Sequence, residues 1–174
     1  EVIANASDTS STSTELESYI RDWPSEYHLT TKRAHLLRAL DLSGLENVLE
    51  LGCGCGAISR YLAEQGLQVD AIEGSSRRAS IALSRCRDLE NINIINSNFN
   101  HLQLPAAAYD AVFLIGVLEY AKRFCPDAAD DRSAVLEILA AVQNTLKPDG
   151  VIITAIENRL GLKYLMGATE DHYG

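Results

Sequence analysis

The feature that most constrains the fold is a regular alternation of short apolar runs with helical patterns between residues 48 and 156. Short runs rich in Val, Ile and Leu predict buried strands. They lie at residues 48–51, 69–72, 92–95, 111–115 and 151–156. Strands separated by helices pair in parallel through right-handed crossovers, and helices cover both faces of the sheet. The sequence therefore predicts an α/β fold with a doubly wound, mainly parallel sheet of about five strands.

Helical patterns predict the segments that precede and connect these strands. Residues 30–42 form one such pattern, with a capping hydroxyl from the threonine pair at its start. A longer amphipathic pattern covers residues 134–146, and the Lys-Pro-Asp-Gly sequence at residues 147–150 should end that helix. The helix before the third strand should bury one face, formed by Ala79, Ala82, Leu83 and Cys86.

The chain divides into four expected parts. Residues 1–14 should be a flexible lead, because residues 5–14 contain no apolar side chain larger than that of alanine. Residues 15–46 form an N-terminal helical segment, and residues 47–157 form the core. Residues 158–174 are a polar tail, which we expect to continue into sequence outside this chain.

Charge and hydropathy exclude two classes of partner. The chain has 24 Asp and Glu against 15 Lys and Arg, a formal net charge of -9 and a pI near 4.8, so nucleic acid is not expected as a partner. The longest apolar stretch, residues 111–118, is far shorter than the roughly 20 residues that a membrane span needs. We therefore expect no membrane span.

Cysteine usage indicates a reducing environment. The four cysteines are too few for a disulfide scaffold, which favours a cytoplasmic protein. Cys53 and Cys55 are separated by one residue and have no second pair, whereas zinc sites space their thiolates by two to four residues. We therefore expect no metal site.

The turn after the first predicted strand carries three glycines, Gly52, Gly54 and Gly56, between a buried strand and a helix. In an open parallel sheet, ligands bind beyond the carboxyl ends of the strands, and glycines allow close approach to the backbone there. Glu73 follows the second predicted strand, about 20 residues after Gly52, where an acid can accept hydrogen bonds from both hydroxyls of a ribose. The spacing Gly52-x-Gly54-x-x-Ala57 also fits the fingerprint of nicotinamide enzymes. The glycine pattern and the acid therefore do not distinguish a nicotinamide cofactor from another cofactor that contains a ribose.

Four ordered motifs resemble those of the class I S-adenosylmethionine-dependent methyltransferase family. They are ELGCGCGA at residues 50–57, the acid Glu73, YDAVFLIGVLEY at residues 109–120 and LKPDGVIITAIEN at residues 146–158. The resemblance covers about residues 27–160 and implies a Rossmann-like fold with S-adenosyl-L-methionine as cofactor. The family's sheet normally ends with strands six and seven, which we do not find after the fifth strand.

The same resemblance implies a set of cofactor-binding residues. Glu50, Gly52, Gly54 and Gly56 would surround the methionine part, and Glu73, Gly74 and Ser75 would hold or border the ribose. Asn98 and Phe99 would contact the adenine, with Asn98 in place of the family's usual Asp. Ile115, Gly116 and Val117 would form the wall beneath the sulfonium.

A narrower resemblance involves residues 27–36, 156–164 and 170–172. They look like methyltransferase modules of bacterial multidomain proteins that also carry glycosyltransferase units. This resemblance implies a sugar hydroxyl as acceptor, with a fused glycosyltransferase module or a second copy of the chain as partner. Arg33 would clamp the methionine carboxylate, and Tyr27 would close over the cofactor.

Methyl transfer is a direct displacement, so the protein mainly holds donor and acceptor in line and excludes water. A hydroxyl acceptor gains from a base, for which the candidates are Glu119, His28 and His172. The predicted function is S-adenosylmethionine-dependent methyl transfer to a small-molecule or glycan acceptor, at a hydroxyl. The alternatives are an NAD-dependent oxidoreductase and a non-catalytic cofactor-binding module.

Overall fold

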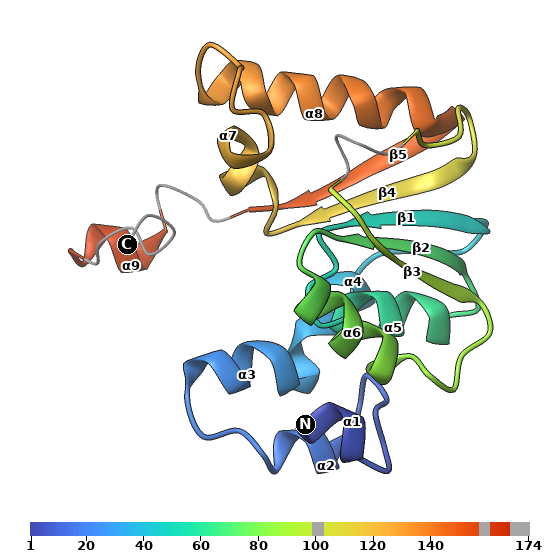
Figure 1. The fold of residues 1–174 in the computed structure, drawn as a ribbon, viewed down its shortest axis with the longest axis vertical. Coiled ribbons are helices and arrows are strands. Elements are labelled where there is room, and N and C mark those ends of the chain that lie inside the picture. The colour runs from blue at the N-terminus through green and yellow to red at the C-terminus, as the bar shows by residue number, and fades with distance from the viewer. Residues whose placement is uncertain (99–102, 157–160, 168–174) are drawn as a thin grey trace.

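A five-stranded parallel sheet forms the centre of the molecule (Figure 1). The computed structural model describes residues 1–98, 103–156 and 161–167. The strands have the order β3-β2-β1-β4-β5 and the bounds β1 Asn47–Leu51, β2 Gln68–Glu73, β3 Ile92–Asn96, β4 Tyr109–Ile115 and β5 Leu146–Ala155. This confirms the predicted doubly wound sheet.

β1 lies in the middle of the sheet, where the order of the strands reverses. Leu49 pairs with Asp70 of β2 on one side and with Val112 of β4 on the other. The carboxyl ends of β1, β2 and β4 therefore meet at one edge of the sheet. In an open α/β sheet, this switch point is where ligands bind.

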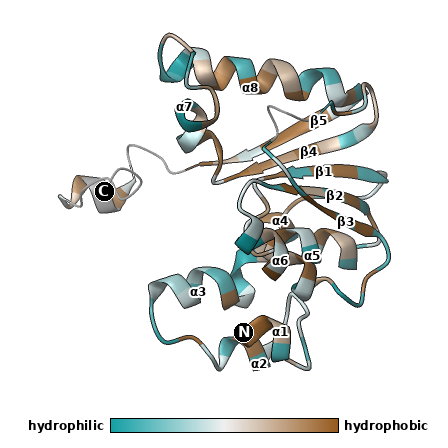
Figure 2. Ribbon diagram, in the orientation of Figure 1, coloured by the Kyte–Doolittle hydropathy of each residue, from teal (hydrophilic) through white to brown (hydrophobic). Residues whose placement is uncertain are grey.

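Helices cover both faces of the sheet (Figure 1). One side carries α5 Ala57–Glu64 and α6 Ser76–Arg85, and the other carries α7 Ala121–Phe124 and α8 Asp131–Thr145. Consecutive residues of β1 pack into different buried clusters. Val48 packs with Leu62 and Phe113 in one buried cluster, and Leu49 packs with Ile138 in the other. Figure 2 shows the hydrophobic colouring along these strands.

The buried face of α6 differs from the prediction at one position. Ala79, Ala82 and Cys86 are buried as expected, but Leu83 is 62% exposed. Each residue advances about 100° around a helix, so Leu83 lies beyond the edge of the narrow face that Ala79 and Ala82 turn toward the sheet.

The connection between α8 and β5 is also different. Residues 147–150 were expected to form the end of the helix, but β5 begins at Leu146 directly after α8. Tyr109 pairs with Leu146 and Ala111 pairs with Val151, so an irregularity in the β4–β5 register accommodates the Lys-Pro-Asp-Gly sequence. In the described part of the chain, β5 is an edge strand and α9 Leu162–Leu165 follows it.

The N-terminal region consists of short helices. Its elements are α1 Val2–Asn5, α2 Thr14–Glu17, α3 Trp23–Leu29, η1 Thr31–Ala34 and α4 His35–Arg38. The expected helix over residues 30–42 is thus two short ones. α3 begins with a capping box, in which Asp22 accepts from the Ser25 N–H and the Ser25 hydroxyl accepts from the Asp22 N–H.

The first residues, expected as a flexible lead, pack on the rest of the protein in this structure. Ile3 is buried in a cluster with Leu16 and Leu29. The Arg87 guanidinium on the α6 side donates to the carbonyls of Ile3 and Ala6. The composition of the first residues does not reveal these contacts. They come from the buried side chains of Ile3 and Ala6 and from backbone carbonyls that accept hydrogen bonds from Arg87.

In the described ranges, none of the helices combines the length and apolar character needed to cross a bilayer.

Candidate functional site

The glycine loop after β1 is held close to the ends of two neighbouring strands. The N–H groups of Gly52 and Cys53 donate to the carbonyl of Ile72 in β2, at 2.8 and 3.0 Å. Gly52 has a φ of +74°, and a β-carbon there would lie 2.7 Å from Cγ2 of Val117, beyond the end of β4. A side chain at position 52 would therefore separate the loop from β4.

Gly54 is different because it borders open space. Its φ is +57°, and no atom beyond Gly54 and its two chain neighbours lies within 4 Å of the position of a β-carbon. Gly54 lines the cavity described below, so its bare backbone faces the space available to a ligand. This is the arrangement that a cofactor lying against the main chain requires.

Glu73 is buried at the carboxyl end of β2 and accepts several hydrogen bonds. One oxygen accepts from the Gly54 N–H at 2.9 Å. The other accepts from the Ser75 N–H and from Nη2 of Arg78, each at 2.8 Å. The carboxylate thus joins the glycine loop to the start of α6 and also lines the cavity.

Glu50 is a second buried acid in the same cavity. Its carboxylate accepts from the Ser59 hydroxyl at 2.5 Å. Burial raises the pKa of Glu50 to about 7, although the Ser59 hydrogen bond and the charge of Arg33 act in the opposite direction. Near neutral pH, the charge of Glu50 therefore responds to any cation that binds beside it.

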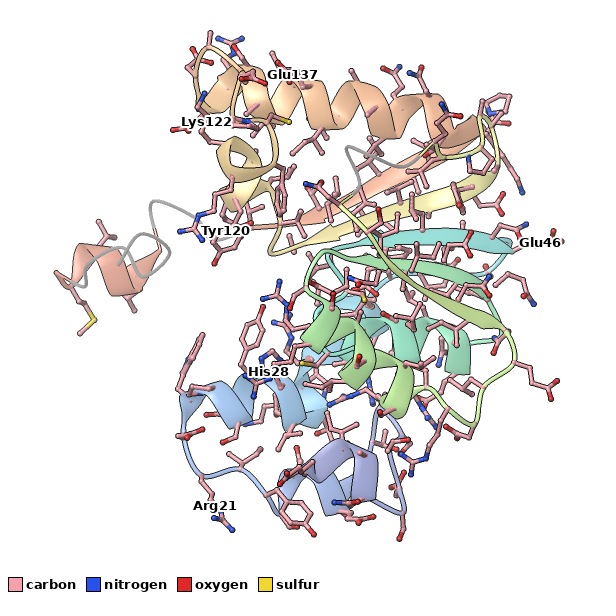
Figure 3. All side chains as sticks on the ribbon, viewed as in Figure 1. Arg21, His28, Glu46, Tyr120, Lys122 and Glu137 are labelled. Atoms are coloured by element: carbon pink, nitrogen blue, oxygen red, sulfur yellow. The ribbon has the colours of Figure 1, made fainter. Side chains whose placement is uncertain are left out.

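One cavity of about 870 Å³ joins these features, and its size lies within the usual range for small-molecule sites. One wall consists of the glycine loop and the ends of β2 and β4. Its other sides come from α3 and, facing α3, from η3 Leu118–Tyr120 and α7 beyond β4. Figure 3 shows His28 and Tyr120 on opposite sides of the gap between α3 and α7, and both residues line the cavity.

Aromatic and cationic side chains form the α3 wall. The rings of Trp23 and Tyr27 lie 5.4 Å apart between centroids. The guanidinium of Arg33 lies 4.1 Å from the centre of the Tyr27 ring and donates to its hydroxyl at 3.2 Å. The Tyr27 hydroxyl is also 3.7 Å from where a β-carbon on Gly116 would be. Tyr27 thus reaches from α3 to the end of β4.

The cavity brings together most of the residues that the sequence singled out. The predicted cofactor-binding residues that line it are Tyr27, Arg33, Glu50, Gly52, Gly54, Glu73, Ile115, Gly116 and Val117. His28, a candidate base, also lines it, and burial lowers the pKa of His28.

Other predicted residues lie outside the cavity lining. Gly56 packs against α6, since a β-carbon there would be 3.0 Å from Cα of Ala82. Gly74 is exposed, and Ser75 is the N-cap of α6. The half-buried residues Asn98 and Glu119 are not among those that line the cavity. Phe99 and His172 fall outside the described residues.

Sequence reasoning missed several residues of the cavity, namely Trp23, Arg78, Tyr120, Arg123 and Phe124. The Asp22 and Pro24 signals for the start of α3 could have placed Trp23 on a helix, but not against this cavity. Cys53 and Cys55 are buried free thiols whose pKa values are raised by burial. In the described part of the chain, no cluster of side chains suits a metal ion.

These features fit a nucleoside cofactor that carries an amino acid. The glycine loop leaves its backbone open to the cavity, and Glu73 places a carboxylate beside it. Glu50 supplies a carboxyl group and Arg33 a cation within the same cavity, and these complement the ammonium and the carboxylate of a zwitterionic group.

Comparison with known proteins agrees with this fit. Residues 49–154 match the family model described as a methyltransferase domain. The chain is 28% identical over 134 residues to the ubiquinone biosynthesis O-methyltransferase of Rickettsia bellii strain OSU 85-389, a match that covers 76% of this chain and 50% of that protein. The chain spans about half the length of the curated relatives it matches.

Solved structures agree as well. The O-methyltransferase segment of StiE, residues 942–1257, is 29% identical with a TM-score of 0.51, and the match covers 70% of this chain and 41% of that one. The PH0226 protein from Pyrococcus horikoshii OT3 shares the fold, with a TM-score of 0.56, 19% identity and coverage of 83% and 59%. The match to the family model extends over more than half of the sequence, and the chain therefore belongs to the family of S-adenosylmethionine-dependent methyltransferase domains.

Proposed function

We propose that this chain transfers a methyl group from S-adenosylmethionine to an oxygen atom of a small-molecule acceptor. The observation that carries the proposal is one cavity, which is lined by the glycine loop and Glu73 and also by residues of α3, η3 and α7. An oxygen acceptor is supported by two relatives that are O-methyltransferases, the Rickettsia bellii protein and the segment of StiE.

The chain's own residues would hold the cofactor from several directions. Glu73 would accept from the ribose hydroxyls, in place of part of its present contact with Arg78. Glu50 would lie beside the methionine part, and Arg33 would bind its carboxylate. The role of Asn98 and Phe99 at the adenine stays a prediction. When bound, the cofactor supplies a methyl carbon on a positively charged sulfur, which leaves as a neutral thioether when the acceptor oxygen bonds to that carbon.

His28 is our proposed base for the acceptor hydroxyl. It lines the cavity from α3, and burial lowers its pKa, so its imidazole is neutral near pH 7 and can accept a proton. As the acceptor oxygen bonds to the methyl carbon, its proton would pass to His28. Glu119 and His172 stay as alternative predictions for this role.

The wider context proposed for the chain is a longer cytoplasmic protein. The StiE domain lies at residues 942–1257 of its own chain, so a related domain occurs inside a much longer one. The four free thiols are consistent with a reducing compartment. A fused glycosyltransferase module, a glycan hydroxyl as acceptor and a homodimer stay predictions from the sequence resemblance.

Titration calorimetry with S-adenosylhomocysteine and with NAD tests the proposal. We expect binding of S-adenosylhomocysteine and none of NAD. Binding of NAD alone would contradict the cofactor assignment. Tight binding of S-adenosylhomocysteine by a full-length protein that methylates no small phenol, alcohol or glycan would instead support a non-catalytic binding module.

A further inference from the structure

A second, small cavity lies at the C-terminal end of α3. Its volume is about 10 Å³, which is about the least that holds one water-sized ligand and is too small for phosphate or an organic molecule. The polar residues that line it are four with hydroxyl groups and two arginines, namely Ser10, Ser11, Thr30, Thr31, Arg33 and Arg85. The cavity is therefore small and polar, as a site for a single ion or water molecule must be.

Arg85 lines this cavity from α6 as a buried cation. The residue is 2% exposed, and its Nη2 donates to the carbonyl of His28 at 2.6 Å. Its Nε–H is buried as well, and has no hydrogen-bond partner among the described residues. Folded proteins pair nearly all buried donors, so this N–H requires a ligand atom as its acceptor.

The charge of Arg85 is also unbalanced. None of the ion pairs in the described part of the chain includes Arg85. Burial lowers the pKa of Arg85, and the charge of Arg60 acts in the same direction. Glu64 attracts Arg85 but is itself paired with Arg60. A buried cation is costly unless an opposite charge accompanies it, and an anion beside Arg85 would supply that charge.

The hydroxyl groups around the cavity are of two kinds. Those of Ser11 and Thr31 donate to carboxylates outside the lining. Thr30 Oγ1 accepts from the Lys32 N–H at 3.2 Å, which leaves its hydroxyl hydrogen as a donor. The Ser10 hydroxyl makes a long contact of 3.5 Å with a second hydroxyl. Because no carboxylate is among the described residues that line the cavity, it offers donors and positive charge, which suit an anion.

The second arginine of the lining has another role. Arg33 donates to the Tyr27 hydroxyl and is assigned above to the cofactor carboxylate. Arg85 is therefore the cation that can hold a ligand in the small cavity.

We propose that a single monatomic anion, such as chloride, binds between Arg85 and the hydroxyls of Ser10 and Thr30 and fixes the C-terminal end of α3 to α6. The Nε–H of Arg85 donates to the anion, while Nη2 keeps the carbonyl of His28. Thr30 directly follows α3, and α6 lies beside α3 (Figure 1), so the anion joins the two helices. The site thus supports the α3 wall of the larger cavity.

Bromide tests the site directly, because it replaces chloride and is recognised by its anomalous scattering. Crystals of the whole chain grown with sodium bromide should show an anomalous peak within hydrogen-bond distance of Nε of Arg85. Electron density there without an anomalous peak would identify a water molecule and overturn the proposal. Bromide peaks confined to the protein surface would mean an adventitious ion only, and would overturn it as well.

Urea unfolding measures the same binding in solution. Chloride is exchanged for gluconate at constant ionic strength, because gluconate is too large for the cavity. The unfolding equilibrium constant should fall about tenfold when chloride reaches about ten times its dissociation constant. Hydrogen exchange across residues 23–29 should slow over the same range of chloride concentration. An unfolding equilibrium that does not depend on chloride would contradict the site, and unchanged exchange would contradict its link to α3.

Matched variants locate the anion. Arg85→Met should abolish the effect of chloride on unfolding, whereas Arg77→Met, at an exposed position of the same helix, should preserve it. Thr30→Val should weaken the affinity for chloride about tenfold, since it removes a donor to a charged group. Full chloride dependence in Arg85→Met would overturn the site, and an unchanged affinity in Thr30→Val would overturn the role of Thr30. If Arg85→Met does not fold, Thr30→Val and the bromide peak still decide.

Discussion

The carboxylate of Glu73 accepts a 2.9 Å hydrogen bond from the backbone N–H of Gly54. This bond links the end of β2 to the loop after β1, so the residue proposed to hold the ribose also shapes the glycine loop. A change at Glu73 therefore affects the cofactor site in two ways, through the ligand and through the loop.

Glu73→Gln should weaken binding of S-adenosylhomocysteine by about 1.5 to 3 kcal/mol, the range for loss of hydrogen bonds to a charged group. The amide has nearly the same shape but donates where the carboxylate accepts. Calorimetry measures the change. Glu46→Gln, at the far end of the sheet in Figure 3, is the control, and equal affinities for the two variants would remove Glu73 from the binding site.

Gly54→Ala should weaken binding of S-adenosylhomocysteine far more than Gly44→Ala. Both glycines have positive φ, +57° and +85°, and both have open space around a new β-carbon. Each substitution should therefore destabilise the fold by a similar amount, about 1 to 2 kcal/mol. Only Gly54 faces the cavity, so only its methyl group meets the ligand. Urea unfolding and calorimetry together test this, and equal loss of affinity in both variants would contradict it.

Glu50 should make the folded protein more stable as the pH falls from about 7 toward 4.5. Burial raises its pKa to about 7 in the folded chain, against 4.5 for the ordinary group, so the folded state takes up a proton first. Above pH 7 the buried charge costs the folded state up to about 3 kcal/mol relative to a neutral group. In urea unfolding at several pH values, Glu50→Gln should lack this contribution. If the free energy of unfolding of Glu50→Gln depends on pH in the same way as that of the unmodified chain, this prediction is wrong.

His28→Gln should lower kcat by about 100-fold, within the range for loss of a general base, and leave the affinity for S-adenosylhomocysteine unchanged. Because burial lowers the pKa of His28, the acidic limb of the kcat profile should lie below the ordinary histidine value of 6.5. His35→Gln, at an exposed position of α4, is the matched control and should keep full activity. A normal kcat for His28→Gln would leave Glu119 and His172 as candidates.

Arg85→Met should loosen α3. Nη2 of Arg85 donates to the carbonyl of His28 at 2.6 Å, and the side chain is buried. The substitution leaves that carbonyl without its partner, at a cost of about 1 to 3 kcal/mol. Hydrogen exchange should quicken across residues 23–29, and binding of S-adenosylhomocysteine should weaken. Arg87→Met removes donors to Ile3 and Ala6 and should affect only the first residues. Unchanged exchange at α3 would contradict this role for Arg85.

Much of the fold could be predicted because its signals are local. The apolar runs of the five strands and the glycine-rich turn depend on neighbouring residues alone, and the structure confirms them. The N-terminal region could not be predicted in the same way. Its short helices depend on distant contacts, such as those of Arg87 with the carbonyls of Ile3 and Ala6.

Some residues of the candidate site could likewise be predicted from local sequence, and others could not. Gly54 and Glu73 follow from the sequence by themselves, because strand ends of a parallel sheet meet at one edge and glycine spacing marks the loop there, whereas Glu50 was expected only from the resemblance to the family. Only the tertiary structure decided which residues of α3 and α7 line the cavity. Trp23 and Arg123 come from distant parts of the chain, and the crossovers that bring α3 and α7 to one cavity leave no periodic signal in the sequence around either residue.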